Sequence, residues 1–216
     1  MRRVLAPAAI AASALLAFGL WFTQRDTPEK VEKLLAQAYT EERTMEYRWP
    51  GAEWGPVRVT RGANASGSSR PLALLDSEEA ISRHAGVGSS WNRVRGQAEI
   101  LEHDPDSAIH HIQNTANGVH QSADLLTKLA IAYSLKAERE KATENRALAL
   151  NLLDEALKID PANRAALYNR AFLKENMGLA RESEVDWTRL LSEEKDPGWI
   201  DETRKRVEEL HSSGSK

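Results

Sequence analysis

The chain has 216 residues, of which 41% are hydrophobic and 28% are charged, and it has no cysteine and a net charge of −3. These values are typical of an ordinary globular protein of one or two domains. The lack of cysteine excludes disulfides, thiolate metal sites and a cysteine nucleophile. The slightly negative charge and the lack of a basic stripe exclude nucleic acid as a partner, because phosphate binding demands clustered Lys and Arg.

An apolar segment at the start of the chain predicts a membrane anchor over residues 1–25. Arg2 and Arg3 precede an uncharged run of nineteen residues from Val4 to Phe22. As a helix this run is about 28 Å long, which matches the hydrocarbon thickness of a bilayer. The two arginines favour a cytoplasmic N-terminus, so we expect a single-pass protein of the inner (cytoplasmic) membrane whose remainder is extracytoplasmic. A cleaved secretory signal and a buried core helix are the alternatives.

Residues 26–60 combine a short helix with an extended segment. Thr27 and Pro28 suit the N-cap and the first position of a helix over residues 28–39, where apolar residues recur at helical spacing. Residues 43–59 are rich in aromatic residues and interrupted by Pro and Gly. This texture predicts extended backbone, either a strand or an arm that lies along another surface.

The Gly and Ser content of residues 61–71 predicts a flexible linker. A helical domain is expected over residues 72–216. It begins with a predicted helix over residues 72–84, for which Ser77 is a candidate N-cap. Glycine and serine in residues 85–90 then predict a turn.

Two sets of small residues recur along this domain. The first set, spaced by 34 and 41 residues, is Gly96, Ala130 and Ala171. The second set, twelve residues behind and spaced by 41 and 34, is Ala108, Ala149 and Ser183. One insertion of about seven residues between Tyr133 and Ala149 explains the unequal intervals. Because small residues let two helix axes approach to about 8–10 Å, the pattern predicts stacked helical hairpins.

The middle repeat carries the most specific motif. The apolar face of its first helix consists of Leu126, Leu129, Ala130 and Tyr133. Its second helix supplies Ala149, Leu153 and Ala156 and ends at Asp160 and Pro161. This run resembles the tetratricopeptide consensus, including the aspartate-proline pair that ends each repeat. The resemblance implies an all-α solenoid of about three hairpins, and residues 198–210 after Pro197 are interpreted as a capping helix.

The order of the segments is also similar to that in the N-terminal regions of bacterial membrane-anchored tetratricopeptide proteins. Some of these proteins carry a caspase-like CHAT protease domain further along the chain. That protease needs a Cys and a His, and this sequence has no Cys. No catalytic residue is therefore carried over from the resemblance.

In tetratricopeptide arrays the first helix of each pair lines a concave face. Carried over position by position, this implies the partner-binding residues Arg93, Gln97, Thr127, Ile131, Tyr168, Phe172 and Asn176. Their mixture of aromatic and polar groups favours a short peptide segment over a polyanion. Packing between repeats is the alternative role for Tyr168 and Phe172. Lys128 and Asn169 match only part of the set with which a subgroup of the family grips C-terminal carboxylates.

Two groups of titratable residues are interpreted as solvent-facing. The histidines, whose spacing does not suit metal coordination, are His103, His110, His111 and His120. The carboxylates that alternate with Lys and Arg on predicted helices are Glu138, Glu140, Glu144, Glu182, Glu184, Asp186, Glu193 and Glu194. We therefore predict no catalytic site, no metal site and no cofactor.

The sequence thus favours a membrane-anchored scaffold that binds a protein or peptide partner through the concave face of helical repeats. One alternative is an accessory or substrate-presenting subunit of a separately encoded enzyme, such as a CHAT-type protease. An enzyme in its own right is the third possibility, but no convergent nucleophile, base and orienting group supports it. No pattern specifies the oligomeric state.

Overall fold

The computed structural model describes residues 26–58, 70–86, 88–115 and 122–213. Over these ranges every regular element is an α-helix and no residue belongs to a strand, so the described protein is all-α. The predicted anchor at residues 1–25, His120 and residues 61–69 of the predicted linker lie outside the described residues. None of the helices in these ranges is both long and apolar enough to cross a membrane.

Helices α2 (Pro28–Glu41) and α3 (Leu72–Arg83) pack against each other and against α4 (Gly88–Leu101). The predicted start of α2 is confirmed, because Thr27 accepts a hydrogen bond from the backbone N–H of Lys30 at 3.3 Å. The predicted N-cap at Ser77 is wrong. Ser77 lies inside α3, where it is fully buried and its hydroxyl donates to the Ala73 carbonyl at 2.6 Å.

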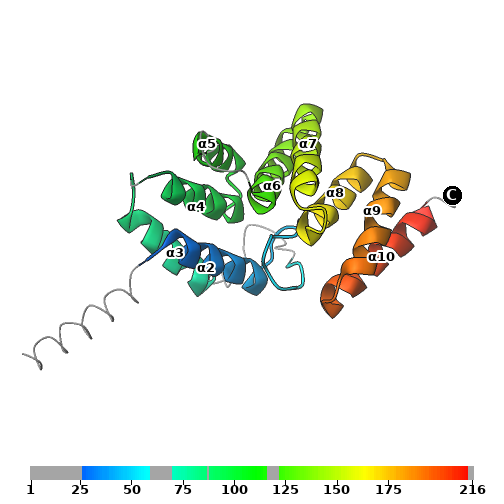
Figure 1. Ribbon diagram of the computed structural model, residues 1–216, viewed down its shortest axis with the longest axis horizontal. Helices are drawn as coiled ribbons and strands as arrows, with labels where there is room; N and C mark the ends of the chain where they lie inside the picture. The colour runs from blue at the N-terminus through cyan, green and yellow to red at the C-terminus, as the bar shows by residue number, and fades with distance from the viewer. Residues whose placement is uncertain (1–25, 59–69, 87, 116–121, 214–216) are drawn as a thin grey trace, which may run out of the picture.

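The next six helices pack as three consecutive pairs (Figure 1). The pairs are α4 with α5 (Pro105–Thr115), α6 (Ala123–Glu140) with α7 (Thr143–Ile159), and α8 (Arg164–Asn176) with α9 (Ala180–Glu193). Successive pairs touch through α5 and α6 and through α7 and α8, and the first helices α4, α6 and α8 also touch one another in sequence. The helix α4 begins at Gly88, so the turn predicted over residues 85–90 is shorter than expected.

The small residues lie where paired helices approach most closely. A Cβ atom on Gly96 would lie 2.7 Å from the Ile112 side chain and 3.0 Å from the Ala108 carbonyl oxygen. In the third pair, the Ser183 hydroxyl donates to the Ala171 carbonyl at 2.8 Å. Both contacts leave no room for a larger side chain, which explains why small residues recur at these positions.

The predicted insertion lengthens the middle pair instead of forming a loop. Helices α6 and α7 have 18 and 17 residues, whereas α8 and α9 have 13 and 14. Only Lys141 and Ala142 separate α6 from α7, and Lys141 takes a left-handed conformation with φ of 54°. The inserted residues therefore extend one end of this antiparallel pair.

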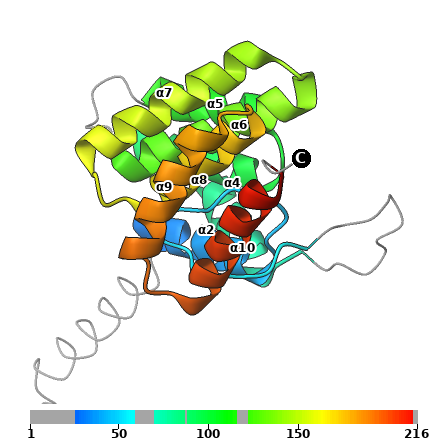
Figure 2. The same cartoon turned by 90° about the vertical axis from the view of Figure 1, so that its right-hand side faces the viewer.

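Helix α10 (Pro197–Ser213) packs against α9 at the end of the array (Figure 2). Asp196 accepts hydrogen bonds from the backbone N–H groups of Gly198 at 2.8 Å and Trp199 at 3.2 Å, which caps the helix. This element confirms the helix predicted after Pro197. Its residues Asp201, Arg204 and Lys205 are exposed, so one side of α10 is charged and faces solvent.

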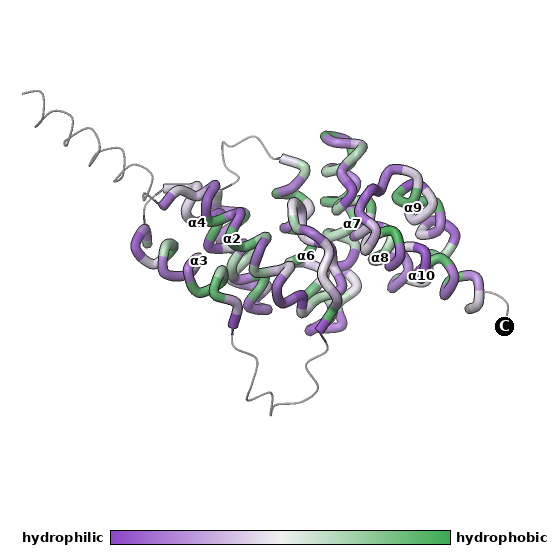
Figure 3. Tube along the Cα trace, turned by 90° about the horizontal axis from the view of Figure 1, so that it is seen from below, coloured by the Kyte–Doolittle hydropathy of each residue, from purple (hydrophilic) through white to green (hydrophobic). Residues whose placement is uncertain are grey.

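Hydrophilic and hydrophobic residues alternate along the helices (Figure 3), as expected for amphipathic elements. The prediction that all the helical carboxylates face solvent is wrong for Asp186 and Glu194, which are 2% and 7% exposed. Asp186 accepts both Nε and a terminal nitrogen of Arg170 at 2.8 and 2.6 Å, and Lys174 at 2.7 Å. Arg170 also donates to Asp154 of α7 at 2.7 Å, so it links two successive pairs.

Candidate functional site

Residues 42–58, which we call the arm, leave the end of α2 and lie below α6 and α8, between α2 and α10 (Figure 1). We call the surface of α4, α6 and α8 that faces α2 and the arm the inner face. The arm contains no strand, and its contacts with the helices confirm the interpretation of an arm along another surface. The protein therefore covers with its own chain part of the face that was predicted to bind a partner.

Asn169 on α8 holds the backbone of the arm. Its side-chain oxygen accepts the backbone N–H of Arg48 at 2.7 Å, and its side-chain nitrogen donates to the Arg48 carbonyl at 2.9 Å. Asn169 is 1% exposed. A single amide side chain thus bonds both the N–H and the C=O of one arm residue, a recognition that does not depend on the identity of that residue's side chain.

Arg43 joins the arm to α10 through an ion pair in which the arginine is fully buried and the glutamate is 18% exposed. Two of its nitrogens donate to the two carboxylate oxygens of Glu202 at 2.7 and 2.8 Å, and Tyr168 donates to the same carboxylate at 2.5 Å. Burial alone would lower the pKa of Arg43, but the bonds to Glu202 raise it above its usual range. Burial would also raise the pKa of Glu202, but the bonds from Arg43 outweigh it and the pKa is lowered.

A second ion pair ties the arm to the segment between α9 and α10. Arg48 donates to Glu194 at 2.5 Å, and Arg164 reaches the other oxygen of that carboxylate at 3.1 Å. The guanidinium groups of Arg43 and Arg48 lie 4.6 and 4.3 Å from the ring of Trp199, within the range of cation–π attraction. The arm is therefore fixed by charge as well as by backbone hydrogen bonds.

Trp49 is the largest apolar group that the arm places on the inner face. It is fully buried, stacks on Tyr39 of α2 and lies 5.3 Å from the Lys128 amine of α6. Lys128 donates to Gln97 at 2.8 Å, and burial lowers the pKa of its amine. Lys128 and Asn169, the two positions that matched part of a carboxylate-gripping set, both contact the arm.

Five of the seven predicted partner-binding residues are buried. They are Gln97, Thr127, Ile131, Tyr168 and Phe172, with exposed fractions of 5% or less. Tyr168 packs between Trp187 and Trp199, with ring centroids 4.9 and 5.1 Å away. Tyr168 therefore has the packing role that was given as the alternative. A role for Tyr168 in partner binding stays a prediction.

The other predicted residues fall in two separate places. Arg93 on α4 is half-buried and donates to Glu32 of α2 at 3.2 Å, and Gln97 donates to the same oxygen at 3.0 Å. Asn176 is exposed at the end of α8, one turn beyond Phe172. The structure thus does not bring all seven residues to one accessible surface, but it brings Phe172 and Asn176 together.

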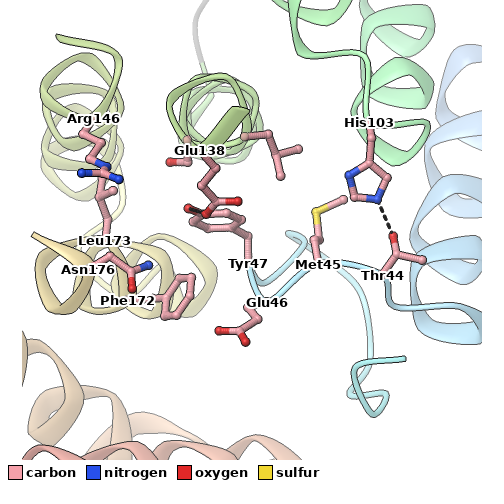
Figure 4. Close-up of a pocket in the computed structure, with 12 residues that line it drawn as sticks. Thr44, Met45, Glu46, Tyr47, His103, Glu138, Arg146, Phe172, Leu173 and Asn176 are labelled. Atoms are coloured by element: carbon pink, nitrogen blue, oxygen red, sulfur yellow. Dashed lines mark hydrogen bonds between the residues drawn. The ribbon is translucent and has the colours of Figure 1, made fainter. Parts of the chain in front are cut away.

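Phe172 and Asn176 line a cavity of about 490 Å³ that the arm leaves open on the inner face (Figure 4). Met45 from the arm, Leu135 from α6 and Leu173 from α8 supply further apolar surface. Tyr47 closes one side, with its ring 5.2 Å from that of Phe172. A volume of this size is in the range of ordinary ligand pockets.

Three polar groups at this cavity come from the ends of helices, and others come from Thr44 and Glu46 of the arm and from His103. Glu138 of α6 accepts the Tyr47 hydroxyl at 2.5 Å. Arg146 of α7 and Asn176 of α8 also line the cavity, and neither side chain makes a hydrogen bond or ion pair with another residue in the described ranges. Burial and the neighbouring Glu138 raise the pKa of Tyr47, so this hydroxyl stays a donor.

Sequence reasoning missed Arg43, Arg48, Glu194 and Glu202. Their signal was the arm itself, a segment with three arginines among aromatic residues that lies outside the repeat pattern. The two glutamates looked like the other charged residues of the last helices, so only the fold distinguishes them.

The histidines show no shared site. His103 is exposed and lies 2.9 Å from the Thr44 hydroxyl, His111 lies 2.8 Å from Glu99, and His110 contacts Asn114 on its own helix. Within the described ranges, no group of three or more His, Asp or Glu residues is placed to hold a metal ion.

No protein-family model matches the chain, and no curated protein is significantly similar to it. The tetratricopeptide resemblance therefore rests on the residues and spacings of this sequence alone.

Proposed function

We propose that this protein is a membrane-anchored scaffold of the tetratricopeptide type that binds extended segments of partner proteins on its inner face. In this proposal the three helix pairs form a short solenoid, α10 caps it, and residues 1–25 hold it at the inner membrane with the helical domain outside the cytoplasm. The protein acts by binding and not by catalysis.

The observation that carries the proposal is the pair of hydrogen bonds between Asn169 and the backbone of Arg48. It supports an inner face whose chemistry suits extended peptide, because the amide side chain pairs with main-chain groups that every residue carries. The open cavity beside Phe172 and Asn176 extends the same face beyond the arm. The described body begins at residue 26, so an anchor over residues 1–25 would keep the cavity near the membrane and raise its effective concentration for partners there.

Site-specific photo-cross-linking in intact cells tests this function with the full chain. A photoreactive amino acid replaces Asn176 at the cavity or, as the control, Lys205 on the exposed side of α10. We expect a discrete protein adduct from position 176 that mass spectrometry can identify, and none from position 205. Adducts from position 205 alone, equal adducts from both positions, or no adduct from position 176 would contradict a binding role for the inner face.

A further inference from the structure

The lengthened middle helix pair contributes to the cavity beside the arm. The insertion lies between Tyr133 and Ala149, and the lengthened ends of α6 and α7 carry Glu138 and Arg146. Both side chains line the cavity (Figure 4). The departure from regular repeat spacing therefore supplies one carboxylate and the guanidinium group of this site.

Asn176 repeats, two turns along α8, the position of Asn169. Residues seven apart lie on one side of a helix, and Phe172 lies between the two asparagines on the same side. Asn169 already holds main-chain N–H and C=O groups of the arm, whereas Asn176 is exposed at the open cavity. The amide at position 176 is thus placed to hold a second extended backbone as Asn169 holds the first.

Some of the charged side chains around the cavity have a bonding partner, and one has none in the described part of the chain. Glu46 is paired with Arg206 at 2.5 Å, and Glu138 accepts the hydroxyl of Tyr47. Arg146 is half-buried and makes no ion pair within the described residues. A half-buried guanidinium without a carboxylate attracts an anionic group, and its planar donors suit a carboxylate best.

We propose that this cavity binds an extended segment of a partner protein that carries an acidic residue next to an apolar one. The acidic side chain pairs with Arg146, the backbone pairs with Asn176, and the apolar side chain packs against Met45, Leu135 and Phe172. The second oxygen of Glu138 accepts a backbone N–H from the segment. This assignment rests on the proposed function, since it names the chemistry of the partner that the inner face binds.

Selection of peptides on the full chain in detergent tests the assignment. The probe is a phage-displayed library of random dodecapeptides, and the selected peptides are then synthesised with blocked termini so that no terminal carboxylate contributes. We expect Asp or Glu beside Leu, Met, Ile or Phe in the selected sequences. Replacing the acidic residue of a selected peptide by Lys should weaken binding at least tenfold.

Two variants and two controls locate the binding. We expect Arg146→Gln and Asn176→Ala to weaken the selected peptides about tenfold, because each removes one of the groups assigned above. Arg204→Gln on α10 and Asn151→Ala on α7 change the same residue types at exposed positions away from the cavity and should leave binding unchanged. Neither Arg146 nor Asn176 bonds another described residue, so circular dichroism should report unchanged folding in both variants.

Three results would overturn the assignment: no enriched sequence, an enriched sequence without acidic residues, or binding that Arg146→Gln leaves intact. The cross-linking experiment separates these failures from a failure of the function. An adduct at position 176 together with any of the three results would keep the inner face as a binding surface and reject the acidic partner segment.

Discussion

The inner face has a covered part and an open part, and the two use α8 differently. In the covered part, Asn169 bonds the backbone of Arg48, and Tyr168 joins the ion pair between Arg43 and Glu202. In the open part, Asn176 lines a cavity and bonds no other described residue. The covered part therefore stabilises the fold, whereas in the open part the side chains of Arg146 and Asn176 make no hydrogen bond or ion pair with the described chain. This difference indicates where mutations should affect stability and where they should affect binding.

The largest effect is expected from removing the charge that pairs with the buried Arg43. The change Glu202→Gln leaves the enclosed charge of Arg43 without a counter-charge, and it should lower the free energy of unfolding by about 3 kcal/mol. Urea unfolding of the full chain in detergent, followed by tryptophan fluorescence, measures this loss. Glu208→Gln on the exposed side of the same helix is the matched control and should change stability by less than about 0.5 kcal/mol. Equal losses in both variants would show that the arm is not fixed by this pair.

The two asparagines of α8 give the most direct comparison. Asn169→Ala leaves the buried N–H and C=O of Arg48 without partners, and should destabilise the protein by about 2 kcal/mol. Asn176→Ala removes an exposed side chain without a bonding partner, and should change stability by less than about 0.5 kcal/mol. Thermal unfolding of both variants beside the unaltered chain measures the difference. Similar losses in the two variants would remove the distinction between the covered and the open part.

Lowering the pH should reduce the loss of stability that Glu202→Gln causes. The pKa of Glu202 is lowered in the folded state, so its stabilisation is present above the pKa of the unfolded chain, near 4.3, and is lost as the pH falls through the lower folded value. The stability difference between the unaltered chain and Glu202→Gln should therefore be constant from pH 7 to about pH 5 and shrink below about pH 4. Urea unfolding across this range measures it, and a difference independent of pH would contradict the role of this carboxylate.

The sequence predicts those parts of the structure that depend on contacts between residues close together in the chain. The helix that starts at Pro28, the close approach at Gly96 and the helix after Pro197 followed from capping and spacing, because such signals act within a few residues. Ser77 was placed wrongly because a serine inside a helix can bond the carbonyl four residues earlier, and its sequence signal resembles that of a cap.

The candidate site depended on contacts that no local pattern encodes. The spacing of the small residues located the insertion after Tyr133. A longer interval between them does not say whether the extra residues form a loop or lengthen two helices. Likewise, the aromatic character of residues 43–59 predicted a strand or an arm, but not the face that it covers. Five predicted binding residues are buried, and their contacts come from distant segments: Gln97 bonds Glu32 of α2, Tyr168 packs between Trp187 and Trp199, and Phe172 packs against the arm.

The bonds of the arm join residues 121, 146 and 159 positions apart in the chain. Arrays held only by contacts between neighbouring units can fold from any point and lose their ends first. In this protein Arg43 leaves the ribosome long before Glu202, and at 5–20 residues per second the delay is about 8–30 s. During synthesis Arg43 and Arg48 therefore lack their carboxylate partners until the residues after α9 have emerged. In the finished chain the same bonds couple the segment after α2 to α10, so we expect these two parts to unfold together.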